Sequence, residues 1–103
     1  GSRCKPVKGG TGAQMKQVMK NLHDLLERHH SSLDRVVKCT LMLADLDDLA
    51  LVNEVYLGYF ARSRLPARSV LAVRRLPRSA RVALDCVALI EEYHEPQALA
   101  PGN

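Results

Sequence analysis

The chain has 103 residues, 47% hydrophobic and 25% charged, and 15 Lys and Arg against 11 Asp and Glu give it a net charge of +4. This length suits one domain with its own core, and the composition excludes a disordered or fibrous protein. The apolar runs are far shorter than the ~18 residues that a membrane span needs. No signal-peptide pattern opens the chain, and Gly1-Ser2 resembles a tag remnant. We therefore expect a single domain without a membrane partner.

Part of the positive charge is gathered in one short segment. Its arginines are Arg74, Arg75, Arg78 and Arg81. Phosphate binding requires clusters of this kind, but single-strand binding also uses aromatic stacking, and the chain has no Trp and one Phe. A solvated basic face is therefore the expectation, and nucleic acid is the less favoured partner.

The three cysteines, Cys4, Cys39 and Cys86, are too far apart for a zinc site, which uses close pairs. An odd number of cysteines without a secretion signal indicates reduced thiols in a cytosol-like compartment. Cys39 and Cys86 lie in apolar runs and are expected to be small buried hydrophobic residues. We predict neither a metal nor a cofactor.

Residues 1–12 are rich in Gly, Lys and Pro and lack periodicity, which predicts a flexible lead segment. The domain is expected over residues 13–90. Its first element is an amphipathic helix from Ala13 to near His29, with Thr11 as its cap. The apolar positions recur at three- and four-residue spacing: Met15, Val18, Met19, Leu22, Leu25 and Leu26.

A strand and a second helix come next. Residues 35–44 are nearly continuously apolar and partly β-branched, which predicts a strand with both faces covered. Residues 45–48, Asp-Leu-Asp-Asp, supply caps and first-turn acidic charges for a helix. Its buried stripe is expected to contain Leu49, Val52, Val55, Tyr56, Tyr59 and Phe60.

Two further strands are predicted over residues 69–73 and 81–90, the latter from its alternating pattern. Residues 76–79, Leu-Pro-Arg-Ser, favour a hairpin-like connection between them. From Glu91 the pattern fades, so residues 91–103 are expected to form a C-terminal tail. The order of elements predicts an α+β domain with both helices on one face of a mixed sheet.

Two amphipathic helices need roughly four to six strands to cover them, and the pattern supplies fewer. The pattern leaves three explanations open: residues 3–8 form a further strand, partner subunits complete the sheet, or a segment before the given sequence is missing. An open sheet edge invites pairing with another chain. We therefore expect a homo-oligomer on physical grounds alone.

Several blocks in order resemble one protein family: SLDRVVKCT at 32–40, ADLDD at 44–48, VNEVY at 52–56, PARS at 66–69 and LP at 76–77. From about Gly9 to Ile90 the chain resembles the RidA/YjgF family of reactive-intermediate deaminases, also known as L-PSP endoribonucleases. The resemblance implies a chorismate-mutase-like fold and trimers with ligand sites in clefts between subunits. It also implies hydrolysis of 2-imino and enamino acids to 2-keto acids and ammonia, in the cytoplasm or, in a eukaryote, in mitochondria.

The resemblance further implies a substrate-binding site. Arg68 matches the family arginine that binds the substrate carboxylate, for which a guanidinium is a rigid two-pronged donor. A surface ion pair is the alternative for Arg68, and the matching PARS block outweighs it. Asn53 matches a helix asparagine near the family cleft, with a plain polar helix residue as the alternative. Ser69 and Val70 complete the predicted substrate-binding residues, and many deaminating members carry Cys in place of Val70.

Two departures from the family put catalysis in question. The family's general acid/base is a glutamate on the last strand, and that position is Ala83 here, so no catalytic residue is assigned. Asp85 faces the same side but lies ~6.6–6.8 Å further along the strand, beyond the ~2.6–3.2 Å of a proton-transfer contact. The family also has a longer segment before its first helix, with an N-terminal hairpin that nothing in residues 1–12 matches.

We therefore expect an N-terminally shortened family member whose deaminase activity is weak or lost. One alternative is a non-catalytic module that binds a small carboxylate or a protein. The other is an endoribonuclease, which would depend on the basic cluster.

Overall fold

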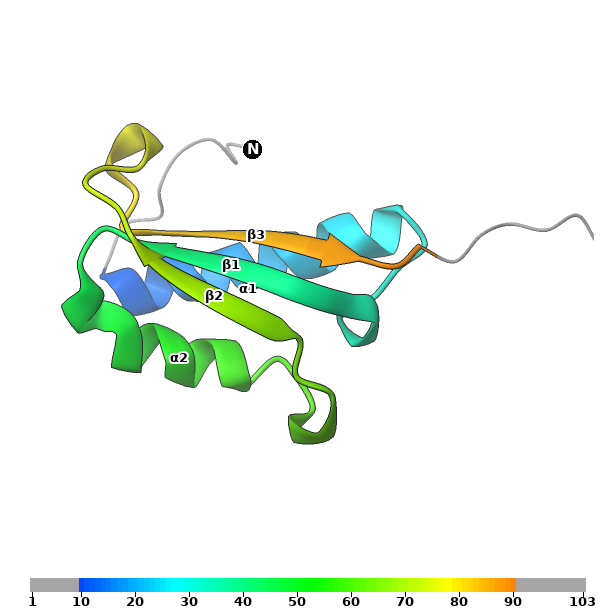
Figure 1. Cartoon of the computed structure of the whole chain (residues 1–103). Coiled ribbons are helices and arrows are strands. Elements are labelled where there is room, and N and C mark those ends of the chain that lie inside the picture. The colour runs from blue at the N-terminus through cyan, green and yellow to red at the C-terminus, as the bar shows by residue number, and fades with distance from the viewer. Residues whose placement is uncertain (1–9, 91–103) are drawn as a thin grey trace, which may run out of the picture.

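The computed structural model describes residues 10–90, which form two helices and a three-stranded sheet (Figure 1). The bounds are α1 Thr11–Arg28, β1 Val36–Leu43, α2 Leu49–Leu57, β2 Ala67–Ala72 and β3 Val82–Ala88. The predicted α+β class and the predicted order of the elements are confirmed.

Some predictions concern parts of the chain that the structure does not describe. A strand over residues 3–8, most of the lead segment and the C-terminal tail from Glu91 all lie outside residues 10–90. Within the described range, no helix is both long enough and apolar enough to cross a membrane.

The sheet is mixed and has the strand order β2-β1-β3, with β1 in the middle (Figure 1). β1 pairs in parallel with β2 and antiparallel with β3. Helix α2 lies in the crossover that a parallel connection between β1 and β2 requires. The predicted hairpin at residues 76–79 is therefore wrong, because β2 and β3 lie on opposite sides of β1. A Leu-Pro-Arg-Ser sequence indicates a local turn but does not determine which strands the turn joins.

Helix α1 begins earlier than its apolar spacing predicts. Gly10 is the N-cap, and Thr11 is already the first helical residue. The Thr11 hydroxyl donates to the Asp48 carboxylate at 2.8 Å instead of capping the helix. The predictions of Thr11 as a cap and of residues 11 and 12 as loop are wrong, because a tertiary contact holds this first turn.

The core lies between both helices and one face of the sheet. Its buried residues are Met15, Met19 and Leu26 of α1, Val36, Cys39, Leu41 and Leu43 of β1, Val52 and Tyr56 of α2, Phe60 after α2, and Val82 of β3. Leu25 and Tyr59, which the spacing places in the buried stripes, are 45% and 38% exposed. Leu25 lies at the flank of the α1 stripe, so α1 buries a narrower surface than predicted, whereas Tyr59 follows the end of α2 at Leu57, so the predicted second stripe extends past the helix.

The opposite face of the sheet is called the open sheet face here. Strand alternation and register place on it Lys38, Thr40 and Met42 of β1, Ser69 and Leu71 of β2, and Ala83, Asp85 and Val87 of β3. Leu71 and Val87 are 49% and 57% exposed. Within residues 10–90, β1 is therefore covered on one face, whereas its apolar run predicts cover on both.

Candidate functional site

Arg68 lies on β2, the strand at one edge of the described sheet, and its side chain is on the face that the helices cover. Its register partner on β1 is the fully buried Cys39. Arg68 and Val70 are half-buried, whereas Ala67 and Ser69 between and beside them are exposed. This alternation directs the guanidinium toward α2.

Two residues of α2 hold the guanidinium of Arg68. Its Nη1 donates to Oδ1 of Asn53, and its central carbon lies 4.8 Å from the centroid of the Tyr56 ring. Asn53 and Tyr56 are three residues apart and so share one face of the helix. Within residues 10–90 the guanidinium has no other hydrogen bond or ion pair, which leaves most of its five N–H donors open to a ligand.

Tyr56 is 2% exposed, and its hydroxyl has no hydrogen-bond partner among the described residues. Burial raises the pKa of Tyr56, the neighbouring Cys39 thiol raises it further, and Arg68 acts in the opposite direction. The ring is therefore a neutral phenol whose face attracts the cation through its quadrupole. The Tyr56 ring also packs against Phe60, with 4.8 Å between the ring centroids.

The structure brings together two of the four predicted substrate-binding residues, Arg68 and Asn53. Val70 is on the same face of β2 but packs against the core, and Ser69 is on the open sheet face. Sequence reasoning assigned Tyr56 to the core and missed its contact with Arg68. The three-residue spacing from Asn53 within the VNEVY block is the signal that points to it.

Ala83 and Asp85 lie on β3, on the far side of β1 from Arg68. Their register partners are Met42 and Thr40, so both lie on the open sheet face. That they share one side is what the sequence predicts. They are separated from the Arg68 side chain by two strand spacings, ~9.4–9.8 Å in all, and by the thickness of the sheet. Within one chain, position 83 and Arg68 therefore do not belong to the same site.

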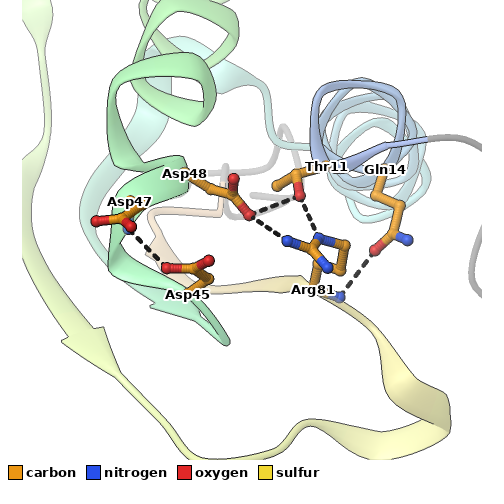
Figure 2. A network of polar contacts seen from close by, with 6 residues as sticks. All are labelled: Thr11, Gln14, Asp45, Asp47, Asp48 and Arg81. Carbon is orange, nitrogen blue, oxygen red and sulfur yellow. Dashed lines mark hydrogen bonds and ion pairs between the residues drawn. The ribbon is translucent and has the colours of Figure 1, made fainter.

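A second polar cluster joins the start of α1, the turn before α2 and the residue directly before β3 (Figure 2). Arg81 donates from Nε to the Thr11 hydroxyl at 2.6 Å and from Nη2 to the Asp48 carboxylate at 2.9 Å. Its backbone N–H donates to Oε1 of the buried Gln14 at 2.9 Å. We call these four residues the Arg81 clasp.

The clasp changes the interpretation of the basic cluster. The hydrogen bond from Thr11 and then that from Arg81 lower the pKa of Asp48, which keeps this carboxylate charged. Arg81 is thus paired within the fold, while Arg74, Arg75 and Arg78 are exposed. Among residues 10–90, no three His, Cys, Asp or Glu side chains come together to hold a metal.

Solved structures share this arrangement of a mixed sheet with two helices on one face, which is a chorismate-mutase-like fold. The solved structure of RidA from Psychrobacter sp. PAMC 21119 matches with a TM-score of 0.76 at 33% identity, over 82% of this chain and 67% of that one. Yeast Mmf1 matches with a TM-score of 0.80 at 34% identity, over 84% of this chain and 69% of that one.

Sequence comparison gives the same family. The family described as Endoribonuclease L-PSP matches residues 2–90. The 2-iminobutanoate/2-iminopropanoate deaminase of Mus musculus is 42% identical over 83 residues, which are 81% of this chain and 61% of the mouse protein. The chain therefore belongs to the RidA/YjgF/L-PSP family, which confirms the predicted resemblance. It spans less than two thirds of the length of this curated relative.

Proposed function

We propose that this protein binds 2-imino and 2-keto carboxylates through Arg68 and hydrolyses the imines only weakly. The observation that carries the proposal is the guanidinium of Arg68, which Asn53 and Tyr56 hold while its remaining donors stay open. A carboxylate accepts two parallel N–H bonds from such a fork, which fixes the orientation of the carbon chain beside it. Similarity to a 2-iminobutanoate/2-iminopropanoate deaminase supports this class of ligand.

The weak turnover follows from the chemistry of imine hydrolysis. Water adds to the imine carbon, a proton moves to nitrogen, and the C–N bond breaks to give a 2-keto acid and ammonia. These proton transfers benefit from a positioned acid/base, and the methyl group of Ala83 cannot supply one. The rate without such a group is expected to be lower by ~10²–10⁴.

The proposal includes a homo-oligomer, a trimer by analogy with the family. The exposed apolar side chains Leu71 and Val87 on the open sheet face support this assembly. In this assembly the open sheet face of one copy, with position 83, lies close to the Arg68 side of its neighbour, so the acid/base missing at Ala83 is one that the neighbouring copy would supply. We place the protein in the cytoplasm, or in mitochondria if the source is eukaryotic.

A second candidate function is binding of a small carboxylate without any turnover. Ala83 favours it, because a binding site needs Arg68 but needs no acid/base. The two candidates predict the same ligand affinity and different rates.

The test is release of 2-ketobutyrate from freshly generated 2-iminobutanoate, with Arg68→Ala, Arg68→Lys and Ala83→Glu compared with the parent chain. We expect slow release that Arg68→Ala abolishes and Ala83→Glu accelerates. Arg62→Ala is the matched control, since Arg62 is an exposed arginine outside the site. Binding with no release in the parent chain would select the non-catalytic candidate. RNA cleavage that survives Arg68→Ala and is lost on neutralising Arg74, Arg75 and Arg78 would select a nuclease.

A further inference from the structure

Cys39 and Cys86 form a pair that the proposed function does not use. They are direct register partners on the antiparallel strands β1 and β3. Their sulfur atoms lie 2.8 Å apart, and both are free thiols. The residues are 47 positions apart in the sequence, so this contact depends on the completed sheet.

The position of the pair in the ladder favours a covalent bond. The Ala44 N–H donates to the Arg81 carbonyl, which identifies residues 44 and 81 as a hydrogen-bonded pair. Hydrogen-bonded and non-hydrogen-bonded pairs alternate along an antiparallel ladder, and the register from Leu43 to Lys38 is unbroken. Cys39 and Cys86 are therefore a non-hydrogen-bonded pair, whose Cα atoms are ~4.5 Å apart. A disulfide accepts Cα separations of ~4.4–6.8 Å, so the strands need not move apart or slide.

The surroundings keep the pair as thiols in the resting protein. Cys39 is fully buried and Cys86 is half-buried, so an oxidant in solution meets Cys86 first. Burial raises the pKa of Cys86, and the Cys39 thiol and the Asp85 charge raise it further. Because the thiolate is the nucleophile in disulfide exchange, the reaction is slow at neutral pH and faster in alkali.

We propose that Cys39 and Cys86 are the site of a reversible intrachain disulfide that links β1 to β3, with a small-molecule disulfide as the oxidant. The thiolate of Cys86 attacks one sulfur of the oxidant, whose S–S bond breaks and releases one thiolate. The thiolate of Cys39 then attacks the Cys86 sulfur and displaces the second. The protein loses two electrons, the oxidant becomes two thiols, and the two cysteine protons go to those thiols.

The experiment equilibrates the full chain with reduced and oxidised glutathione at several ratios and pH 8, followed by acid quenching. Intact mass should show the loss of two hydrogens, and peptide mapping should join Cys39 to Cys86. A link across this long a loop restricts the unfolded chain, so Tm should rise by at least ~5 °C and fall back with dithiothreitol. The Cys4→Ser variant, which lacks the third thiol, should behave like the parent chain.

Cys86→Ala should abolish both the mass change and the Tm shift. If that variant does not fold, the peptide map of Cys4→Ser still decides the question. The proposal is overturned if the folded chain keeps both thiols at glutathione ratios that oxidise the same chain in urea. Glutathione adducts or Cys4-containing links as the sole products would also overturn it.

Discussion

The guanidinium of Arg68 lies over the ring of Tyr56, with 4.8 Å between its central carbon and the ring centroid. The cation is half-buried at the sheet edge, while the ring is a fully buried member of the core. The proposed ligand-binding group therefore rests directly on the hydrophobic core, and a change in core packing at this point reaches the ligand.

Variants of Tyr56 separate the role of the ring from that of the hydroxyl. Tyr56→Phe keeps the ring and removes a buried hydroxyl without a hydrogen-bond partner in residues 10–90. We expect its free energy of unfolding to stay within ~1 kcal/mol of the parent chain, with affinity for 2-ketobutyrate unchanged. Tyr56→Ala should cost ~3–5 kcal/mol and weaken binding. Urea unfolding and titration calorimetry measure both quantities. A stable Tyr56→Phe variant with reduced affinity would instead indicate that the Tyr56 hydroxyl contacts the ligand.

Replacement of Arg68 tests the proposed carboxylate contact. Loss of one charge-assisted hydrogen bond is worth ~1.5–3 kcal/mol, so Arg68→Ala should weaken 2-ketobutyrate binding at least ~10-fold. Arg68→Lys should give an intermediate affinity, because an ammonium keeps the charge without the planar fork. Titration calorimetry provides the affinities. Arg64→Ala, an exposed arginine in the connection before β2, is the control and should bind like the parent chain.

The Arg81 clasp predicts a pH dependence of stability. The hydrogen bonds from Thr11 and Arg81 lower the pKa of Asp48 below its ordinary value of 3.8, so the folded protein binds this proton less readily than the unfolded chain. The stabilisation is present above pH 3.8 and is lost as the pH falls through the lowered pKa. Urea midpoints from pH 7 to pH 2 should show this loss.

Asp48→Asn should lower the urea midpoint at pH 7 and make its decline in acid shallower. Asp47→Asn is the matched control, because it removes a neighbouring exposed carboxylate that is not part of the clasp. An identical pH profile in the parent chain and Asp48→Asn would contradict the role assigned to this carboxylate.

Gln14 should stabilise the fold through one hydrogen bond, which its side chain accepts from the backbone N–H of Arg81. Gln14→Met keeps the volume of a buried side chain but removes the acceptor for the Arg81 N–H. Loss of a partner for a desolvated amide costs ~1–3 kcal/mol, so the free energy of unfolding should fall by that amount. Hydrogen exchange of the Arg81 amide should accelerate in parallel. Gln17→Met is the control. The Gln17 side chain bonds only Asn21 on the helix surface in the described structure, so this variant should leave both quantities unchanged.

A charge on the open sheet face tests the proposed oligomer. Val87 is 57% exposed, and Val87→Glu would place a carboxylate inside the interface that the proposal requires. We expect sedimentation equilibrium to show a smaller species for this variant than for the parent chain. Leu25→Glu, at a 45% exposed position on α1, is the matched control and should keep the parent's size. Equal sizes for all three proteins would argue against this face as the interface.

Periodicity predicted the elements because it reflects which side of each element is buried. The apolar spacing predicted α1 and α2, and the nearly continuous apolar run at residues 35–44 predicted β1, which spans Val36–Leu43. Strand pairing is a non-local property, so the turn at residues 76–79 did not reveal that β1 separates β2 from β3. The early start of α1 at Thr11 also depends on Asp48 and Arg81, which are distant in the sequence.

The candidate site was predictable only in part. Arg68 and Asn53 came from their resemblance to family positions, and the structure places them in contact. The contact of Tyr56 with Arg68 was not predicted, because a buried position in the apolar stripe does not reveal that the same ring also packs against a cation. The separation of Ala83 from Arg68 could not be read from the sequence, since it depends on which strand lies in the middle and which face each residue occupies.

The bond from the Arg81 amide to Gln14 also affects how the chain can change in length. A slip of β3 by one residue would exchange its two faces, and in a hairpin the turn prevents such a slip. Here Arg81, the residue directly before β3, is held by Gln14 and Thr11 of α1. Insertions between Val73 and Ala80 should therefore leave the alignment of β3 unchanged, which makes this connection the natural place for homologues to differ in length.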